Sequence, residues 1–306
     1  MKFVILFVLV AMSTFSFAWT NEATGEMLQA RYQYAACNVD YAEEWLSMRE
    51  GCGHRNNASV FDSSEHMEDI REDLADLKEA ADEDDQFEFG VAMFQYGGHS
   101  VRLLGALLGD AFDGHKNMHF FSCVRDDEKP LMDDLEDCKH NAMEQERTAS
   151  KKYVGNEIRY ANDQVDELDR LGANTDGMVE VIGYGDELEA DIDRAFDSGE
   201  TSEIRALYLR HSRILLLFRM QKMLSTIDYA RPMIEASSNS NKEEVLEDMD
   251  QLEGDIEDSL ADCEYSAEVD DLGEYGGQNF ECWEDSLDLF DDFNGIRMKI
   301  LGGIFS

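Results

Sequence analysis

Residues 202–234 carry two apolar stripes, and this feature constrains the fold more than any other part of the sequence. One stripe is formed by Ile204, Leu207, Ile214 and Phe218, and the other by Leu209, Leu216, Met220, Met223, Ile227, Ala230 and Ile234. Spacings of three, four and seven residues place each stripe on one face of an α-helix. Since both faces need apolar neighbours, we predict that 202–234 is the central helix of a bundle.

The same helical periodicity recurs along most of the chain. It predicts helices at about 22–49, 63–83, 87–112, 131–171, 178–197 and 279–300, with a further apolar seam from Val245 to Leu260. The first of them has alternating spacings of four and three, which is typical of lengthwise, coiled-coil-like packing. The longest changes phase near 153–156, which predicts a kink or a change of packing partner there. With two prolines and no alternating strand pattern, the expected fold is an all-α, antiparallel multi-helix bundle.

The first eighteen residues have the pattern of a secretory signal. Lys2 precedes an apolar run, and Ser16 and Ala18 provide the small residues of a cleavage site. We therefore expect residues 1–18 to be removed and residues 19–306 to form one acidic helical bundle, although an uncleaved membrane anchor is the alternative. The most apolar later stretch, 89–109, contains polar and basic residues and is expected to be a buried helix, so no transmembrane span is predicted after cleavage.

The acid excess is extreme, with 68 acidic against 26 basic residues and a formal charge of −42. Such a chain repels itself in dilute buffer, whereas molar salt screens its charges to about 3 Å. A halophilic source explains this composition, and a disordered acidic tail is the competing explanation. Nucleic acid is not an expected partner because no basic face is available to meet phosphate. Weak, nonspecific binding of cations is the only ligand property that the surface charge itself predicts.

Six cysteines in an exported chain predict three disulfides. They fall into sequential couples, which favours local pairing of a loop to a helix end. The expected pairs are Cys37–Cys52, Cys123–Cys138 and Cys263–Cys282.

One group of residues has the spacing of a metal site. His115, His119 and Cys123 recur every four residues and would share a helical face, while Cys138 and His140 follow closely. Imidazole and thiolate ligands of this kind suit Zn²⁺ or copper. The competing interpretation places both cysteines in disulfides and the histidines on the surface, and we prefer it, so that no metal and no cofactor is expected.

Two stretches of the chain have the same predicted order of elements. An acidic helix, a short acidic turn and an apolar helix occur at 63–112 and again at 178–231, which indicates either a duplication or a chance similarity of acid-rich helices. The apolar helix at 87–112 contains Gly90, Gly97, Gly98, Gly105 and Gly109. Since glycine destabilises a helix by about 1 kcal/mol relative to alanine, we expect these glycines to allow close backbone approach by a neighbouring helix. A cofactor or lipid slot against the same smooth face is the alternative.

The central helix also carries polar groups within its apolar pattern. His211 is expected to be a core histidine bonded to a carboxylate, with a pH switch as the functional alternative. The basic residues of this helix are expected to pair with acids of adjacent helices; they are Arg205, Arg210, Arg213, Arg219, Lys222 and Arg231.

Signatures of the common enzyme classes are absent from the sequence. The sequence therefore favours a non-enzymatic structural or interaction module at or outside the cell surface, which binds an unknown protein or itself. An extracytoplasmic metal-binding protein using the 115–140 cluster is the second hypothesis. An enzyme with an unrecognised carboxylate site is the third, and no sequence feature supports it.

Overall fold

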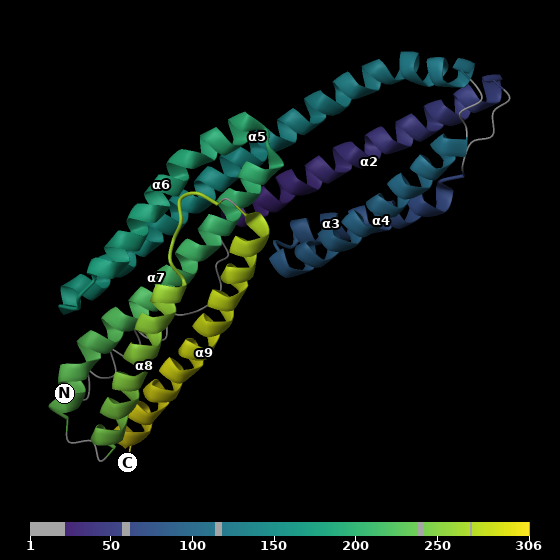
Figure 1. The fold of residues 1–306 in the computed structure, drawn as a ribbon. Helices are drawn as coiled ribbons and strands as arrows, with labels where there is room; N and C mark the ends of the chain where they lie inside the picture. The colour runs from purple at the N-terminus through teal and green to yellow at the C-terminus, as the bar shows by residue number, and fades with distance from the viewer. Residues whose placement is uncertain (1–21, 57–61, 114–117, 238–240, 270, 306) are drawn as a thin grey trace. The chain divides into compact units, whose positions relative to one another are not determined.

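The structure, a computed structural model, confirms the all-α class. It describes residues 22–56, 62–113, 118–237, 241–269 and 271–305. These residues form eight helices and no strand (Figure 1). The helices are α2 (Glu22–Asn56), α3 (Ser64–Asp82), α4 (Gln86–Asp113), α5 (Met118–Leu171), α6 (Asp176–Ser198), α7 (Thr201–Glu235), α8 (Lys242–Asp262) and α9 (Leu272–Phe305). The predicted signal sequence, 1–18, lies outside the described residues.

The helices belong to two compact units, Thr20–Tyr153 and Val154–Ser306. Helix α5 is continuous and contributes its first part to one unit and its last part to the other. The boundary between Tyr153 and Val154 coincides with the phase slip in the sequence, so the predicted change of packing partner at 153–156 is confirmed. Among the described residues, no helix is both long enough and apolar enough to cross a membrane.

In the unit formed by residues 20–153, helix α3 packs against both α2 and α4. The apolar seam of α2 is buried at Leu28, Ala35 and Val39, as the heptad pattern predicts. Leu77 of α3 is fully buried in the same core, together with Phe89 at the start of α4. The three-helix core thus follows directly from apolar residues at helical spacing.

Two disulfides join α2 to α5, and the expected pairing of these four cysteines is wrong. Cys37 is bonded to Cys138, with their Cα atoms 5.9 Å apart, and Cys52 is bonded to Cys123 at the same Cα distance. Both members of each expected pair lie on one continuous helix, fifteen residues apart. That separation spans about 22 Å of helix axis, far beyond the Cα distance that a disulfide allows. The third expected pair, Cys263–Cys282, is confirmed.

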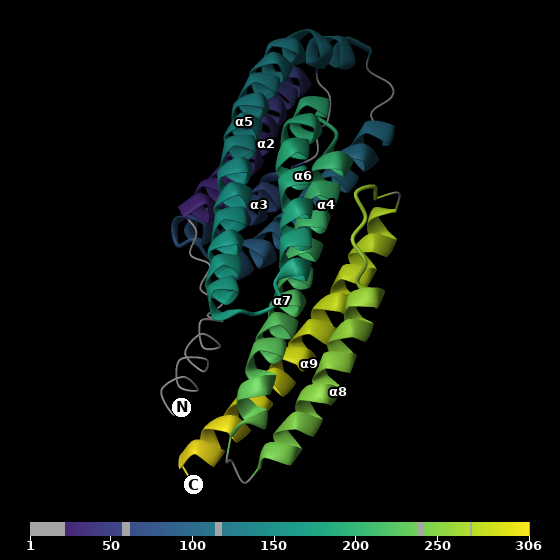
Figure 2. The same ribbon diagram turned by 90° about the vertical axis from the view of Figure 1, so that its left-hand side faces the viewer.

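The first part of α5 corrects a second expectation. The predicted helices 87–112 and 131–171 leave residues 113–130 without a helix, but α5 begins at Met118 and contains Pro130. Cys123 ties this part to α2, and Glu128 accepts hydrogen bonds from Tyr41 Oη and Trp45 Nε1 of α2, each at 3.1 Å. These contacts hold the segment helical, and the axis bends near this end of α5 (Figures 1 and 2), as proline causes.

The unit formed by residues 154–306 is organised around α7, as predicted. Helix α7 contacts α6, α8 and α9, so its apolar faces are covered on more than one side. The seam residues Met220 and Met223 are completely buried, and Leu207 and Ile227 are nearly so. Gly199 ends α6 with a φ of 66°, a left-handed conformation that glycine adopts at little cost.

Candidate binding surfaces

The cysteines of the predicted metal cluster are not available as ligands. Cys123 and Cys138 lie in different disulfides, and a disulfide sulfur is a poor metal ligand. His140 is exposed on α5. His115 lies outside the described residues, and so does the side chain of His119. In the part of the chain that the structure describes, no group of three or more His, Cys, Asp or Glu side chains could hold a metal ion.

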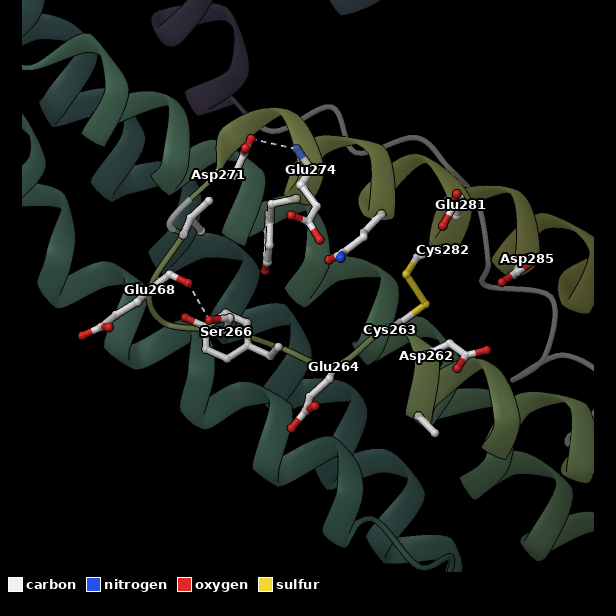
Figure 3. A pocket seen from close by; sticks show the side chains of 15 residues that line it. Asp262, Cys263, Glu264, Ser266, Glu268, Asp271, Glu274, Glu281, Cys282 and Asp285 are labelled. Atoms are coloured by element: carbon white, nitrogen blue, oxygen red, sulfur yellow. Dashed lines mark hydrogen bonds between the residues drawn. A yellow bond between two sulfur atoms is a disulfide. The ribbon is translucent and has the colours of Figure 1, made fainter.

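A cavity of about 840 Å³ lies between the end of α8 and the start of α9 (Figure 3). That volume is within the range of small-molecule sites. Its carboxylate lining comes from the end of α8, the connecting loop and the first turns of α9: Asp262, Glu264, Glu268, Asp271, Glu274, Glu281 and Asp285. Among the described residues, the lining contains no Lys, Arg or His, and its neutral polar groups include Tyr265, Ser266, Tyr275 and Gln278.

Three connections hold the cavity loop in place. The Cys263–Cys282 disulfide ties the loop's first residue to α9 (Figure 3). Arg210 of α7 donates to the Tyr265 hydroxyl from Nε at 3.1 Å and from Nη2 at 2.7 Å. The Tyr265 ring in turn stacks on Tyr184 of α6, with ring centroids 4.5 Å apart. The loop is therefore fixed by contacts with three helices rather than by its own sequence.

Arg213 lies beneath the cavity and is only 1 % exposed. Its Nε donates to Asn279 Oδ1 at 2.6 Å, and its Nη1 donates to the backbone oxygen of Glu264 at 3.0 Å. Asn279 donates onward to the backbone oxygen of Leu209 at 2.7 Å. The third guanidinium nitrogen, Nη2, has no hydrogen-bond partner, and no described carboxylate pairs with this arginine. The network joins α7, the loop and α9 through neutral acceptors.

Tyr275, in the first turn of α9, is a buried polar residue of the cavity lining. It is 8 % exposed, and the Arg213 guanidinium carbon lies 4.9 Å from its ring centroid. Its hydroxyl oxygen is shielded from solvent, and the backbone N–H of Ser266 acts on it as a donor. Burial raises the pKa of Tyr275, which keeps the hydroxyl protonated near neutral pH.

The cavity carboxylates differ from the paired acids elsewhere in this unit. Asp271 caps α9 by accepting from the backbone N–H groups of Gly273 and Glu274 at 2.8 and 3.1 Å. Among the described residues, none of the cavity carboxylates forms an ion pair with a basic side chain. By contrast, Asp191 pairs with Arg210 at 2.9 Å, and Asp248 pairs with Lys299 at 2.7 Å. The mouth of the cavity thus carries uncompensated negative charge.

The polar groups predicted on the central helix have mixed outcomes. His211 Nε2 lies 2.6 Å from Glu157 Oε2, so the expectation of a core histidine beside a carboxylate is confirmed. Arg210 and Arg231 pair with acids of α6 and α8, as predicted. Arg213 instead meets neutral acceptors, as described above. Lys222 donates to the amide oxygen of Gln164 at 2.7 Å.

Helix α4 presents an apolar outer face, and here the expected close packing is wrong for three of its five glycines. The surroundings of Gly105 and Gly109 lie outside what the structure describes. Gly90, Gly97 and Gly98 face open space, with no atom within 4 Å of a Cβ built at each position. On the same face Phe94 is 85 % exposed and Val101 is 69 % exposed. Phe89, Ala92 and Leu103, on the opposite face, occupy the core, which leaves the glycines outside.

The loop at 264–278 is rich in acids and glycine, and this composition alone does not reveal the cavity. The missing information was the convergence of Arg210 and Arg213 on that loop, since these residues lie 55 and 51 positions from their partners in it. No known protein family, curated protein or solved structure shows significant similarity to this chain.

Proposed function

We propose that the protein is a non-enzymatic, exported structural module that associates with a second copy of itself through α4. The observation that carries this proposal is the exposure of Phe94 on a helix face that is otherwise apolar or glycine. An aromatic side chain that is 85 % exposed costs solvation free energy until a partner covers it. Three disulfides support a location in an oxidising compartment.

The shape of this face favours a second copy. Gly90, Phe94, Gly97, Gly98 and Val101 lie at intervals of three and four, on one side of the helix. A helix surface on which one large side chain lies between glycines is complementary to a second copy of the same surface. In an antiparallel pair, Phe94 of each helix fits the glycine surface of the other, as a two-fold interface requires.

The charge of α4 supports the same partner. Residues 89–109 contain no Asp or Glu, although the chain has 68 acids in total. Two copies of a protein with a formal charge of −42 repel each other over most of their surfaces. The acid-free stretch is where such copies approach with the least repulsion.

The mass of the mature chain in molar NaCl, measured by light scattering after size exclusion, tests the proposal. We expect a dimer, and Phe94→Asp should raise the dimer dissociation constant by at least tenfold by placing charge in the interface. Gly97→Leu is the sharper variant. It adds apolar area, which would increase nonspecific association, but it fills the surface into which Phe94 fits and should therefore also produce monomers.

The matched control is Phe280→Asp on α9, where Phe280 is 56 % exposed and outside the proposed interface. It should leave the dimer intact. A monomeric parent chain, or a Gly97→Leu variant that associates more strongly than the parent, would refute self-association through this face.

A further inference from the structure

The Cys52–Cys123 disulfide joins a buried residue to an accessible one, and the inference that follows from it does not depend on self-association through α4. Cys52, on α2, is fully buried, whereas Cys123, on α5, is only partly buried. An external thiolate therefore has access to the bond from the Cys123 side. Both residues of the Cys263–Cys282 disulfide are buried, so that bond is shielded from the same attack.

A guanidinium group lies against the buried sulfur. Arg55 Nη2 donates to Cys52 Sγ at 3.3 Å, and its Nε donates to the backbone oxygen of Gly51 at 3.2 Å. A neighbouring arginine stabilises a thiolate, and a sulfur that is stabilised as the thiolate is the better leaving group in thiol–disulfide exchange. In the part of the chain that the structure describes, no basic side chain donates to a sulfur of the other two disulfides.

The Cys37–Cys138 disulfide is the informative comparison. Cys138 is exposed, so this bond is at least as accessible as Cys52–Cys123. The sulfur that would leave belongs to Cys37, which is buried without a cation beside it. Apolar burial disfavours the thiolate and slows its departure. Access for the attacking thiolate and stabilisation of the leaving thiolate therefore coincide at Cys52–Cys123.

The start of α5 depends on this bond. Pro130 has no backbone N–H, so one hydrogen bond of the helix is missing at this point. Residues 118–130 are tied to α2 by the disulfide and by the hydrogen bonds that Glu128 accepts. The part of α5 after Pro130 keeps the Cys37–Cys138 bond. Opening of Cys52–Cys123 thus loosens the first part of the helix and leaves the second part attached.

We propose that Cys52–Cys123 is a reducible tether, which an external dithiol opens by attack on Cys123 Sγ, releasing residues 118–130 from α2. The attacking thiolate bonds to Cys123 Sγ, the disulfide bond breaks, and its electron pair stays on Cys52 Sγ beside the Arg55 guanidinium. The second thiolate of the reagent then displaces Cys123 from the mixed disulfide. The dithiol is oxidised to a disulfide, and both cysteines are reduced.

Timed reduction of the folded chain by dithiothreitol in molar NaCl tests this assignment. Freed thiols are trapped with iodoacetamide and located by mass spectrometry of proteolytic fragments. We expect Cys52 and Cys123 to be labelled about tenfold faster than the other four cysteines. Arg55→Gln should slow the opening of this bond about three- to tenfold, whereas Arg55→Lys, which keeps the positive charge, should retain more of the rate.

Lys139→Gln is the matched charge control. Lys139 follows Cys138 in the sequence, and its ammonium lies 5.3 Å from the Tyr34 ring centroid, away from Cys52. This variant should leave the opening rate of Cys52–Cys123 unchanged. After selective reduction of the parent chain, amide hydrogen exchange should rise over residues 118–130 and stay unchanged in the part of α5 that follows.

Equal labelling rates at all six cysteines, or earlier labelling of Cys37 and Cys138, would overturn the assignment. An unchanged opening rate in Arg55→Gln would equally rule out the role of the guanidinium. Unchanged hydrogen exchange over residues 118–130 after selective reduction would show that the contacts of Glu128 suffice to hold this segment, which contradicts its release.

Discussion

Lys222 is a buried cation on the central helix, and it is only 6 % exposed. Burial lowers its pKa from 10.5 to about 8. Since the unfolded chain keeps the higher pKa, it binds more protons than the folded chain between these two values, and stability rises with pH through this window. At neutral pH Lys222 is protonated in both the folded and the unfolded state. The folded state is then destabilised by the net cost of burying the charge, which is about 3 kcal/mol for this pKa shift.

We therefore expect Lys222→Met to stabilise the protein by roughly 1–3 kcal/mol at pH 7, because methionine keeps an apolar stem of similar length without the charge. The hydrogen bond to Gln164 is lost, but Gln164 is only half-buried and can turn to water. Denaturant unfolding in molar salt at pH 7 and pH 10 measures the effect. The advantage of the variant should shrink at the higher pH.

Lys299→Met is the matched control. Lys299 is exposed enough to hydrate, and its bonds to Asp248 and Glu244 raise its pKa rather than lower it. This variant should not gain stability. An unchanged or lower stability of Lys222→Met at pH 7 would show that the ammonium is better solvated than its burial indicates.

The four cysteines of α2 and α5 form a ladder whose spacing is visible in the sequence. Cys37 and Cys52 are fifteen residues apart, and so are Cys123 and Cys138. Because the two helices are antiparallel and the spacings are equal, Cys37 lies opposite Cys138 and Cys52 lies opposite Cys123. Arg31 pairs with Glu146 across the same two helices at 2.6 Å, which agrees with that register.

The two disulfides of this ladder join residues 101 and 71 positions apart, and each should stabilise the fold by about 4–5 kcal/mol in the chain-entropy model. The double variant Cys52→Ala/Cys123→Ala is therefore expected to unfold at lower denaturant while keeping the other disulfide. Mass mapping of proteolytic fragments without reduction checks the pairing in the parent. A fragment joining Cys37 to Cys52 would contradict the ladder and the continuous helices on which it depends.

Apolar periodicity was sufficient to predict the helices and the central place of α7, because burial of a stripe is a local property of the sequence. It could not decide which glycines of α4 face outward, because large apolar residues lie on both sides of this helix. Phe89 is buried and Phe94 is exposed. The sequence prediction paired cysteines that are close in sequence. It therefore failed to find the bonds from Cys37 to Cys138 and from Cys52 to Cys123, which the equal spacing on two helices allows. The cavity depended on side chains of α7 meeting a distant loop, which no local pattern encodes.

At the scale of the whole molecule, charge decides the conditions under which the chain folds. Subtracting 26 basic from 68 acidic residues leaves at least 42 acids that no basic side chain can neutralise. Several of the basic residues join neighbouring helices, as Arg71 does with Glu43 and Lys299 with Asp248. Exposed pairs of this kind contribute at most about 1 kcal/mol each, and salt weakens them. Screening of the excess acids should therefore outweigh the loss of these pairs.

We expect the helical circular dichroism of residues 19–306 to increase steeply from dilute buffer to molar salt. The Debye length falls from about 30 Å at 0.01 M to about 3 Å at 1 M, which removes repulsion between carboxylates on neighbouring helices. KCl and NaCl should act alike if screening is the cause. Sucrose stabilises compact states by exclusion without screening charge, so at equal osmolality it should restore less helix. Full helicity at low ionic strength would show that core burial and three disulfides overcome the repulsion unaided.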